Sequence, residues 1–276
     1  MKSLKKAGIV TLGLIMALSV SGCGKTEEKN QEVTEVVRVG VVGEANEMWN
    51  PVMDELAKEG ILVELISFSD YATPNAALNG GEVDLNAFQH YAYLNSEIEN
   101  NGYQITSIGD TYISAMNIYS DRYEDISQVK EGDKIAIPND ATNGGRALKV
   151  LEGAGLLEIK PEAGDNPEVS DITSNPLNLE LVEVDAANVY SLLPDVAAGV
   201  INCNYALDSG LNPKEDAIFA DSLEVYESDS YVNLIAARTE DADKEVYKKV
   251  VKAYQSEAVK AVYEDTFQGA YLPAWE

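Results

Sequence analysis

The sequence predicts an α/β fold of two lobes, and three observations support this prediction. Short β-branched runs alternate with amphipathic helical segments along most of the chain, which is typical of parallel sheets covered by helices. The alternation forms two series, and we expect a linking strand near residues 113–120 between them. The length of 276 residues and the apolar content of 45% are sufficient for two separate cores.

The first series contains three expected strands and three expected helices. Residues 36–42 read VVRVGVV, and such a nearly continuous apolar run predicts a strand covered on both faces. A helix should follow, with Asn50 as its N-cap, Pro51 at its first position and Gly60 at its end. Its inward face would consist of Trp49, Val52, Met53 and Leu56. The other elements are strands at 61–68 and 83–88, a short helix at 74–78 stopped by Gly80 and Gly81, and a helix through about Glu99.

The second series begins with a strand at residues 134–138 and a helix at 143–152. It continues with a strand at 179–184, a helix at 187–193 and a strand at 199–202. Residues 161–176 are rich in Gly, Pro, Asp, Asn and Ser, so we expect an exposed loop there. After a further strand at 231–237 comes a long C-terminal helix. Its apolar residues recur every four positions, at Val246, Val250, Tyr254, Ala258 and Val262.

The order of these elements predicts the architecture of bacterial solute-binding proteins. The linking strand expected near 113–120 leads from the first series to the second, and the C-terminal strand and helices can rejoin the first series. We therefore expect a type II periplasmic-binding-protein-like fold, in which two α/β lobes are joined by two crossing strands. The ligand cleft should lie between the lobes, at the carboxyl ends of strands. The expected lobes are residues 36–117 together with 230–276, and residues 118–229.

The first 22 residues are expected to be a signal peptide. Three lysines, at positions 2, 5 and 6, precede an uncharged apolar run at residues 7–20, which is the pattern of a secretory signal. The run ends in Val-Ser-Gly-Cys, which resembles the bacterial lipobox. We therefore expect cleavage before Cys23, a diacylglycerol on its thiol and a flexible lipidated tether at residues 23–35. The alternative is an ordinary cleaved signal that is followed by a cysteine by chance.

The charge of the chain limits its partners. The sequence has 20 basic and 47 acidic residues, a net charge of −27, and loss of the three lysines at the N-terminus would give −30. Nucleic acids and anionic lipid surfaces attract basic proteins, so neither should bind this chain by charge. Membrane attachment would depend on the two acyl chains at Cys23. We therefore expect a lipid-anchored protein on the extracytoplasmic face of the cell membrane, with no nucleic-acid partner.

Sequence motifs of catalysis and metal binding are absent. There is no phosphate-binding P-loop, no nucleophile elbow and no calcium-binding loop. The single histidine, His90, and the two cysteines exclude zinc clusters and disulfide frameworks. A catalytic pair of carboxylates could occur without a recognisable motif, but a solvated surface is the simpler explanation of the many acidic residues. We expect no enzyme, no cofactor and no metal site, and we expect Cys203 to be a small buried apolar residue.

Seven blocks of the sequence resemble the methionine-binding NlpA-type lipoproteins, the solute receptors of bacterial ABC importers. The blocks are FSDY at 68–71, NAFQH at 86–90, IAIPND at 135–140, GRAL at 145–148, GLNPKEDAIF at 210–219, YVNLI at 231–235 and KAYQS at 252–256. They follow in the family's order across nearly the whole mature chain. The resemblance implies the two-lobed fold and a free amino acid ligand, methionine, with L-methionine as the expected form. It also implies the permease and ATPase subunits of an importer as partners.

The resemblance further implies which residues hold the ligand. Arg146 would bind the carboxylate, because the planar fork of arginine matches a carboxylate and a helix start adds positive potential. Asn202 and Asn233 would bind the ammonium and the remaining polar atoms. The ligand-binding set is completed by Asn143 and by a side-chain pocket of Tyr71, Phe88, His90 and Tyr91. Taken alone, these residues also have plainer explanations, as a surface arginine, strand-end caps or core aromatic residues.

Two segments near the expected pocket depart from the family pattern. Residues 43–49 read GEANEMW where many members have a Gly-Pro-rich turn, and Tyr91-Ala92 stands where many members have Lys-Pro. D-methionine, another apolar amino acid and a methionine-containing dipeptide therefore stay alternative ligands. A surface lipoprotein or adhesin without a transport role is the alternative from a different class. In the preferred interpretation the ligand bridges the two lobes and so favours their closed arrangement.

Overall fold

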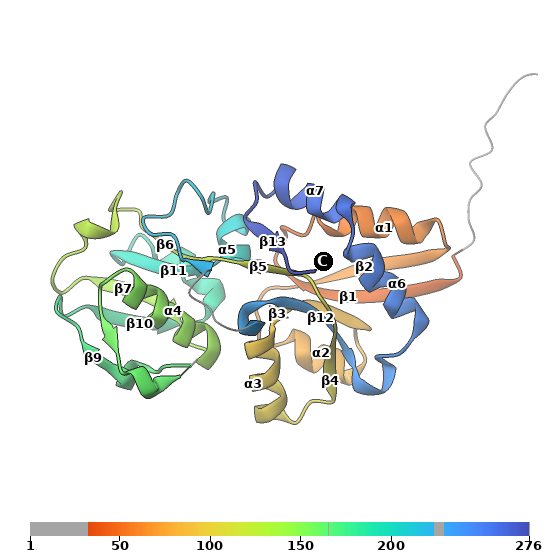
Figure 1. The fold of residues 1–276 in the computed structure, drawn as a ribbon, viewed down its shortest axis with the longest axis horizontal. Coiled ribbons are helices and arrows are strands. Elements are labelled where there is room, and N and C mark those ends of the chain that lie inside the picture. Colours follow the sequence, from red (N-terminus) through yellow and green to blue (C-terminus); the bar gives the residue numbers. More distant parts are fainter. Residues whose placement is uncertain (1–32, 165, 224–228, 276) are drawn as a thin grey trace, which may run out of the picture. The chain divides into compact units, whose positions relative to one another are not determined.

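The computed structural model describes residues 33–164, 166–223 and 229–275 (Figure 1). The expected signal peptide, Cys23 and most of the expected tether lie outside these ranges. The first sheet consists, in spatial order, of β2 (Ile61–Phe68), β1 (Glu35–Val42), β3 (Leu85–His90), β12 (Asn233–Arg238) and β4 (Ile105–Asp110). β1 pairs in parallel with β2 and β3, whereas β12 is antiparallel to β3 and β4.

Helices cover both faces of the first sheet. One face carries α1 (Trp49–Ala57), α6 (Glu245–Tyr254) and α7 (Glu257–Asp265), and the other carries α2 (Pro74–Gly80) and α3 (Tyr91–Asn101). Alternate residues of β12 pack into the two hydrophobic cores on opposite faces of the sheet, because successive side chains of a strand point to opposite faces. Ile235 and Ala237 pack in the core under the first group of helices, and Leu234 and Ala236 pack in the core under the second.

The second sheet consists of four strands. In spatial order these are β10 (Glu180–Val184), β7 (Lys134–Pro138), β11 (Ala198–Asn202) and β6 (Met116–Tyr119). β7 is parallel to both of its neighbours, and β6 is antiparallel to β11. α4 (Ala141–Gly153) buries Ala147, Leu148 and Leu151 against one face. The short helix α5 (Cys203–Asp208) follows β11 directly.

Two segments cross between the sheets. β5 (Tyr112–Ser114) leads from β4 towards β6 and pairs with β13 (Tyr271–Pro273) in the middle of Figure 1. The second segment follows the bridge between Ile118 and Phe219 and returns the chain to β12. The fold is therefore the predicted one, with an α/β lobe around each sheet, while the predicted lobe boundaries stay a proposal. Within the described ranges, no helix is long and apolar enough to cross a membrane.

The start of α1 differs from the prediction. The helix begins at Trp49 with Met48 in the N-cap position, and the side chain of Met48 makes no capping hydrogen bond. The prediction of Asn50 as N-cap is therefore wrong. Met48 and Trp49 are 3% and 1% exposed, so burial of these two apolar side chains, rather than a polar cap, accompanies the start of the helix.

Other predicted elements are broken up in the structure. The helix expected at 187–193 is two short 3₁₀ turns, Ala186–Asn188 and Tyr190–Leu192. The loop expected at 161–176 contains a short strand, β9 (Ile172–Ser174), which pairs with β8 (Glu158–Ile159). The single C-terminal helix is α6 followed by α7, because the side chain of Ser256 caps a new helix by accepting a hydrogen bond from the Val259 N–H. The buried positions of α7 are accordingly Val259 and Tyr263, and Ala258 is exposed.

Candidate functional site

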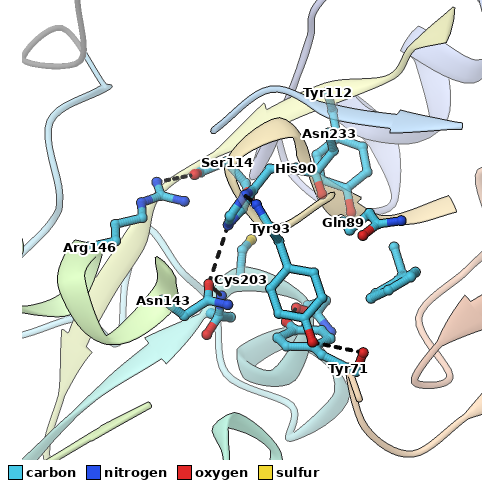
Figure 2. A pocket seen from close by; sticks show the side chains of 13 residues that line it. Tyr71, Gln89, His90, Tyr93, Tyr112, Ser114, Asn143, Arg146, Cys203 and Asn233 are labelled. Carbon is cyan, nitrogen blue, oxygen red and sulfur yellow. Dashed lines mark hydrogen bonds between the residues drawn. The ribbon is translucent and has the colours of Figure 1, made fainter. Parts of the chain in front are cut away.

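A pocket lies between elements of the two sheets (Figure 2). The first lobe contributes the end of β3, the start of α3, the start of β12 and the loop before α2. The second lobe contributes the first two turns of α4, the end of β11 and the start of α5. The lining residues are Tyr71, Phe88, Gln89, His90, Tyr93, Tyr112, Ser114, Asn143, Arg146, Asn202, Cys203, Asn204 and Asn233.

Seven of the eight ligand-binding residues expected from the sequence line this pocket. They are Tyr71, Phe88, His90, Asn143, Arg146, Asn202 and Asn233. Tyr91 is not among the lining residues. As the first residue of α3 it turns away, and its hydroxyl donates to Asp110 Oδ1 at 2.6 Å and lies 3.0 Å from Ser107 Oγ. Cys23, the expected lipidation site, lies outside the described residues.

His90 is held in one orientation by its backbone and by its ring. It pairs with Asn233 across β3 and β12, so two sequence-distant residues lie side by side at the pocket. Its Nδ1 accepts the N–H of Tyr93 at 3.1 Å and thereby caps α3. A neutral ring then carries its proton on Nε2, which lies 3.4 Å from Asn143 Oδ1 and donates to it. Burial, and then the charge of Arg146, lowers the pKa of His90 to about 3, so the ring is neutral at physiological pH.

Asn143 orients its neighbours because its own carboxamide is fixed. Asp140 caps α4 by accepting the N–H of Asn143 at 2.9 Å, so α4 begins two residues earlier than the sequence suggested. Both carboxylate oxygens of Asp140 also accept from Asn143 Nδ2, each at 3.0 Å. Asn143 Oδ1 therefore faces the pocket, where it accepts from Asn202 Nδ2 at 2.7 Å and from His90.

Asn202 presents a buried acceptor to the pocket. It occupies the N-cap position of α5, but its side chain makes no capping hydrogen bond and its Nδ2 donates to Asn143 instead. Among the described residues, no group hydrogen-bonds to its Oδ1, although the atom is buried. An unpartnered buried carbonyl costs roughly 1–3 kcal/mol, and a ligand with an N–H donor would relieve this cost.

Arg146 supplies a buried positive charge. It lies in the second turn of α4, because the helix begins at Ala141, and only 3% of its surface is exposed. Its Nη2 donates to the carbonyl of Ser114 at 2.7 Å and to Asp221 Oδ2 at 3.1 Å (Figure 2 shows Ser114). The guanidinium carbon lies 4.5 Å from the centre of the Tyr231 ring, a cation–π distance. These contacts fix the guanidinium beside the pocket.

Aromatic rings form the opposite part of the pocket. The ring centre of Tyr71 lies 5.9 Å from that of Phe88, 6.0 Å from that of Tyr93 and 4.9 Å from that of Tyr205. The hydroxyl of Tyr71 donates to Asn204 Oδ1 at 2.5 Å, and that of Tyr93 donates to the carbonyl of Tyr71 at 3.0 Å. Because these hydroxyls are engaged, the rings present an apolar and polarisable wall to a ligand.

Sequence reasoning missed several residues of the site. Tyr93 could have been found, because it lies three positions after His90, at the spacing of a capping residue and its partner. Tyr112 and Ser114 lie on a crossing strand that was predicted without functional residues. No local pattern indicated Asp221, which reaches Arg146 from 75 residues away. Cys203 is buried as expected, and burial raises the pKa of its thiol to about 12.

Comparison with known proteins identifies the family. The family model described as NlpA lipoprotein matches residues 37–275. The chain belongs to the NlpA lipoprotein family. A family member from Yersinia pestis, named D-methionine-binding lipoprotein MetQ, is 38% identical over 278 residues, which cover 99% of this chain and 100% of that protein. The resemblance found in the sequence is therefore confirmed.

Solved structures of similar proteins share the fold. A nutrient binding protein from Burkholderia cenocepacia bound to methionine is 43% identical, with a TM-score of 0.82 over 87% of this chain and 100% of that chain. The substrate binding protein of a methionine transporter from Streptococcus pneumoniae is 34% identical, with a TM-score of 0.82 over 87% and 96% of the two chains. These relatives are substrate-binding proteins rather than enzymes, in agreement with the expected class.

Proposed function

We propose that this NlpA lipoprotein is the solute-binding protein of an ABC importer and that it binds methionine between its lobes. The observation that carries the proposal is that one pocket contains both a buried cation, Arg146, and a buried acceptor without a partner among the described residues, Asn202 Oδ1. A free amino acid has the complementary charges. The names of the relatives, each of which refers to methionine, support the choice of ligand.

The chemistry of the pocket suits each part of methionine. The carboxylate would lie at Arg146, whose guanidinium is held in place by Ser114 and Asp221. The ammonium would donate to Asn202 Oδ1, and neutral His90 would add no competing charge. The thioether would contact the wall of Tyr71, Phe88 and Tyr93, where each sulfur–aromatic contact contributes about 0.3–1.5 kcal/mol.

Closure of the lobes would couple binding to transport. The pocket takes side chains from both sheets, so a bound ligand favours the arrangement in which the two lobes meet. The permease and ATPase subunits would then receive methionine from this closed form, with a lipid on Cys23 holding the protein at the extracytoplasmic face of the membrane. Preference for the L-form stays a prediction.

A ligand panel tests the proposed function. The purified chain is titrated by calorimetry and thermal shift with L-methionine, D-methionine, other apolar amino acids and methionine-containing dipeptides. Methionine should stabilise the fold by about 2.7 kcal/mol at a hundredfold excess over Kd. A panel in which no compound shifts the unfolding transition would overturn the proposal and favour a surface lipoprotein without transport function.

The lipid anchor needs its own measurement. Intact mass spectrometry of the protein extracted from membranes should give a chain that begins at Cys23 and carries a diacylglycerol. A freely secreted and unmodified chain would contradict the anchoring but would leave the ligand proposal standing.

A further inference from the structure

A carboxylate of the second lobe reaches the backbone of the first lobe outside the ligand pocket. Asp208 is the last residue of α5, and its Oδ1 accepts the N–H of Glu44 at 3.0 Å and the N–H of Ala45 at 2.8 Å. These partners lie in the loop after β1, more than 160 residues away in the chain. The contact therefore joins the two lobes.

The loop after β1 is held by hydrogen bonds within the first lobe that do not involve Asp208. Gly43 has a φ of +79°, a conformation that favours glycine. Its N–H donates to the carbonyl of Phe68 at 3.0 Å. Its carbonyl accepts from Ser67 Oγ at 2.8 Å and from Asn46 Nδ2 at 3.0 Å. With Gly43 fixed in this way, the next two backbone N–H groups form a small anion-binding concavity.

The position of Asp208 has no explanation within the second lobe alone. A negative charge at the C-terminal end of a helix opposes the helix dipole, so the position of Asp208 does not stabilise α5. Gly43, which its positive φ already favours, also leaves room for this contact, because a Cβ atom there would meet the Asp208 carboxylate. The hydrogen bonds from Asp208 to the other lobe account for a carboxylate at this position.

The contact lies where it can hold the two lobes together, away from the segment that returns the chain to β12. β1 lies on the side of β3 that faces away from β12, the strand to which the second crossing segment returns. Other side chains of α5 reach the same edge of the first lobe, since Asn204 accepts from the Tyr71 hydroxyl and Tyr205 packs on the Tyr71 ring. α5 thus makes a row of contacts to the loops after β1 and β2.

We propose that Asp208 and the backbone of residues 43–45 form a latch that stabilises the closed arrangement of the lobes, and so tightens ligand binding without touching the ligand. The inference rests on the proposed function, because closure matters only if a ligand binds between the lobes. The apparent Kd rises as the population of the binding-competent form falls. Asp208 is therefore a positioning residue, and its loss should raise Kd and speed ligand dissociation.

The test compares Asp208→Ala with wild type and with Asp195→Ala, which removes an exposed carboxylate elsewhere in the second lobe. Calorimetry and stopped-flow dissociation with L-methionine should show Asp208→Ala weaker by about three- to tenfold, with a matching rise in the dissociation rate and an unchanged control. Asp208→Asn should recover part of the loss, because its carbonyl can accept the same two N–H groups. Equal affinity in Asp208→Ala and wild type would overturn the latch.

The two proposals fail in different ways. If wild type binds methionine and Asp208→Ala binds it equally well, the latch is wrong and the proposed function stands. If wild type binds no compound of the panel, the proposed function is wrong and X-ray scattering from the ligand-free full chains decides the latch. Asp208→Ala should then have a larger radius of gyration than wild type and Asp195→Ala, and equal radii would overturn the latch.

Discussion

Replacement of Asn202, whose Oδ1 has no partner among the described residues, should weaken ligand binding while leaving the stability of the free protein nearly unchanged. Asn202→Leu replaces the carboxamide by an apolar side chain of similar size. It removes the buried Oδ1, for which no partner is found among the described residues, and the hydrogen bond from Nδ2 to Asn143. Since the ligand ammonium is expected to bond to Oδ1, the substitution should remove a contact that exists only in the complex.

The expected changes in Kd and in the free energy of unfolding follow from the hydrogen bonds that are lost. A charge-assisted hydrogen bond contributes about 1.5–3 kcal/mol, so Kd for L-methionine should rise by roughly 10- to 150-fold. In the free protein the lost bond to Asn143 costs about 0.5–1.5 kcal/mol, while removal of an unsatisfied buried oxygen returns a similar amount. The free energy of unfolding should therefore change by less than about 1 kcal/mol.

The assay combines titration calorimetry with urea denaturation of the ligand-free chain. Asn175→Leu serves as control, because Asn175 makes two hydrogen bonds to the backbone of Leu179, at 2.9 and 3.0 Å, and does not line the pocket. The control should lose stability and keep its affinity, the reverse of Asn202→Leu. A Kd for Asn202→Leu within twofold of wild type would refute the role assigned to this oxygen.

Three further predictions concern buried ionisable groups. Arg146→Ala should abolish methionine binding and cost about 3–5 kcal/mol of stability, because it removes the guanidinium that faces the buried Asp221 carboxylate. Adding Asp221→Asn should restore most of the stability in urea but not the binding, and binding by either variant would contradict the assignment. His90 has a folded-state pKa of about 3 against 6.5 when unfolded, so the unfolded chain takes up the proton first and stability falls as the pH drops below about 6.5. The free energy of unfolding of wild type should fall relative to that of His90→Gln by up to about 1.4 kcal/mol per pH unit between pH 6.5 and 3, and parallel curves would count against a neutral buried ring. With the pKa of Cys203 raised to about 12, no thiol should react with a disulfide reagent at pH 8 in the native membrane-extracted protein. One thiol should react after unfolding, and a second one would show that Cys23 carries no lipid.

Much of the fold was predictable because local patterns agree with the tertiary structure. The strand at 61–68 and the strand at 134–138 match β2 and β7 at both ends, since each is an apolar run bounded by turn residues. The C-terminal helix was predicted as one element because the four-residue spacing continues through its break. Ser256 starts a new helix there, and the local preference of a serine for an N-cap outweighs the periodicity.

The site was less predictable because it depends on contacts between distant segments. The strand predicted at 83–88 is β3 at Leu85–His90, and this two-residue shift places His90 at the strand end, opposite Asn233. Tyr91 was assigned to the pocket by its neighbours in the sequence, but it begins a helix and points to Asp110. The resemblance to a family indicated Arg146, whereas only the folded chain shows which carboxylate holds it.

Methionine is proposed to bind between the lobes with its carboxylate at Arg146 and its ammonium at Asn202. A crystal structure of the chain grown with L-methionine tests it most directly. One ligand is expected in the pocket of Figure 2, with its nitrogen within hydrogen-bonding distance of Asn202 Oδ1 and its carboxylate on the guanidinium of Arg146. A ligand bound elsewhere, or turned so that its ammonium faces Arg146, would contradict it.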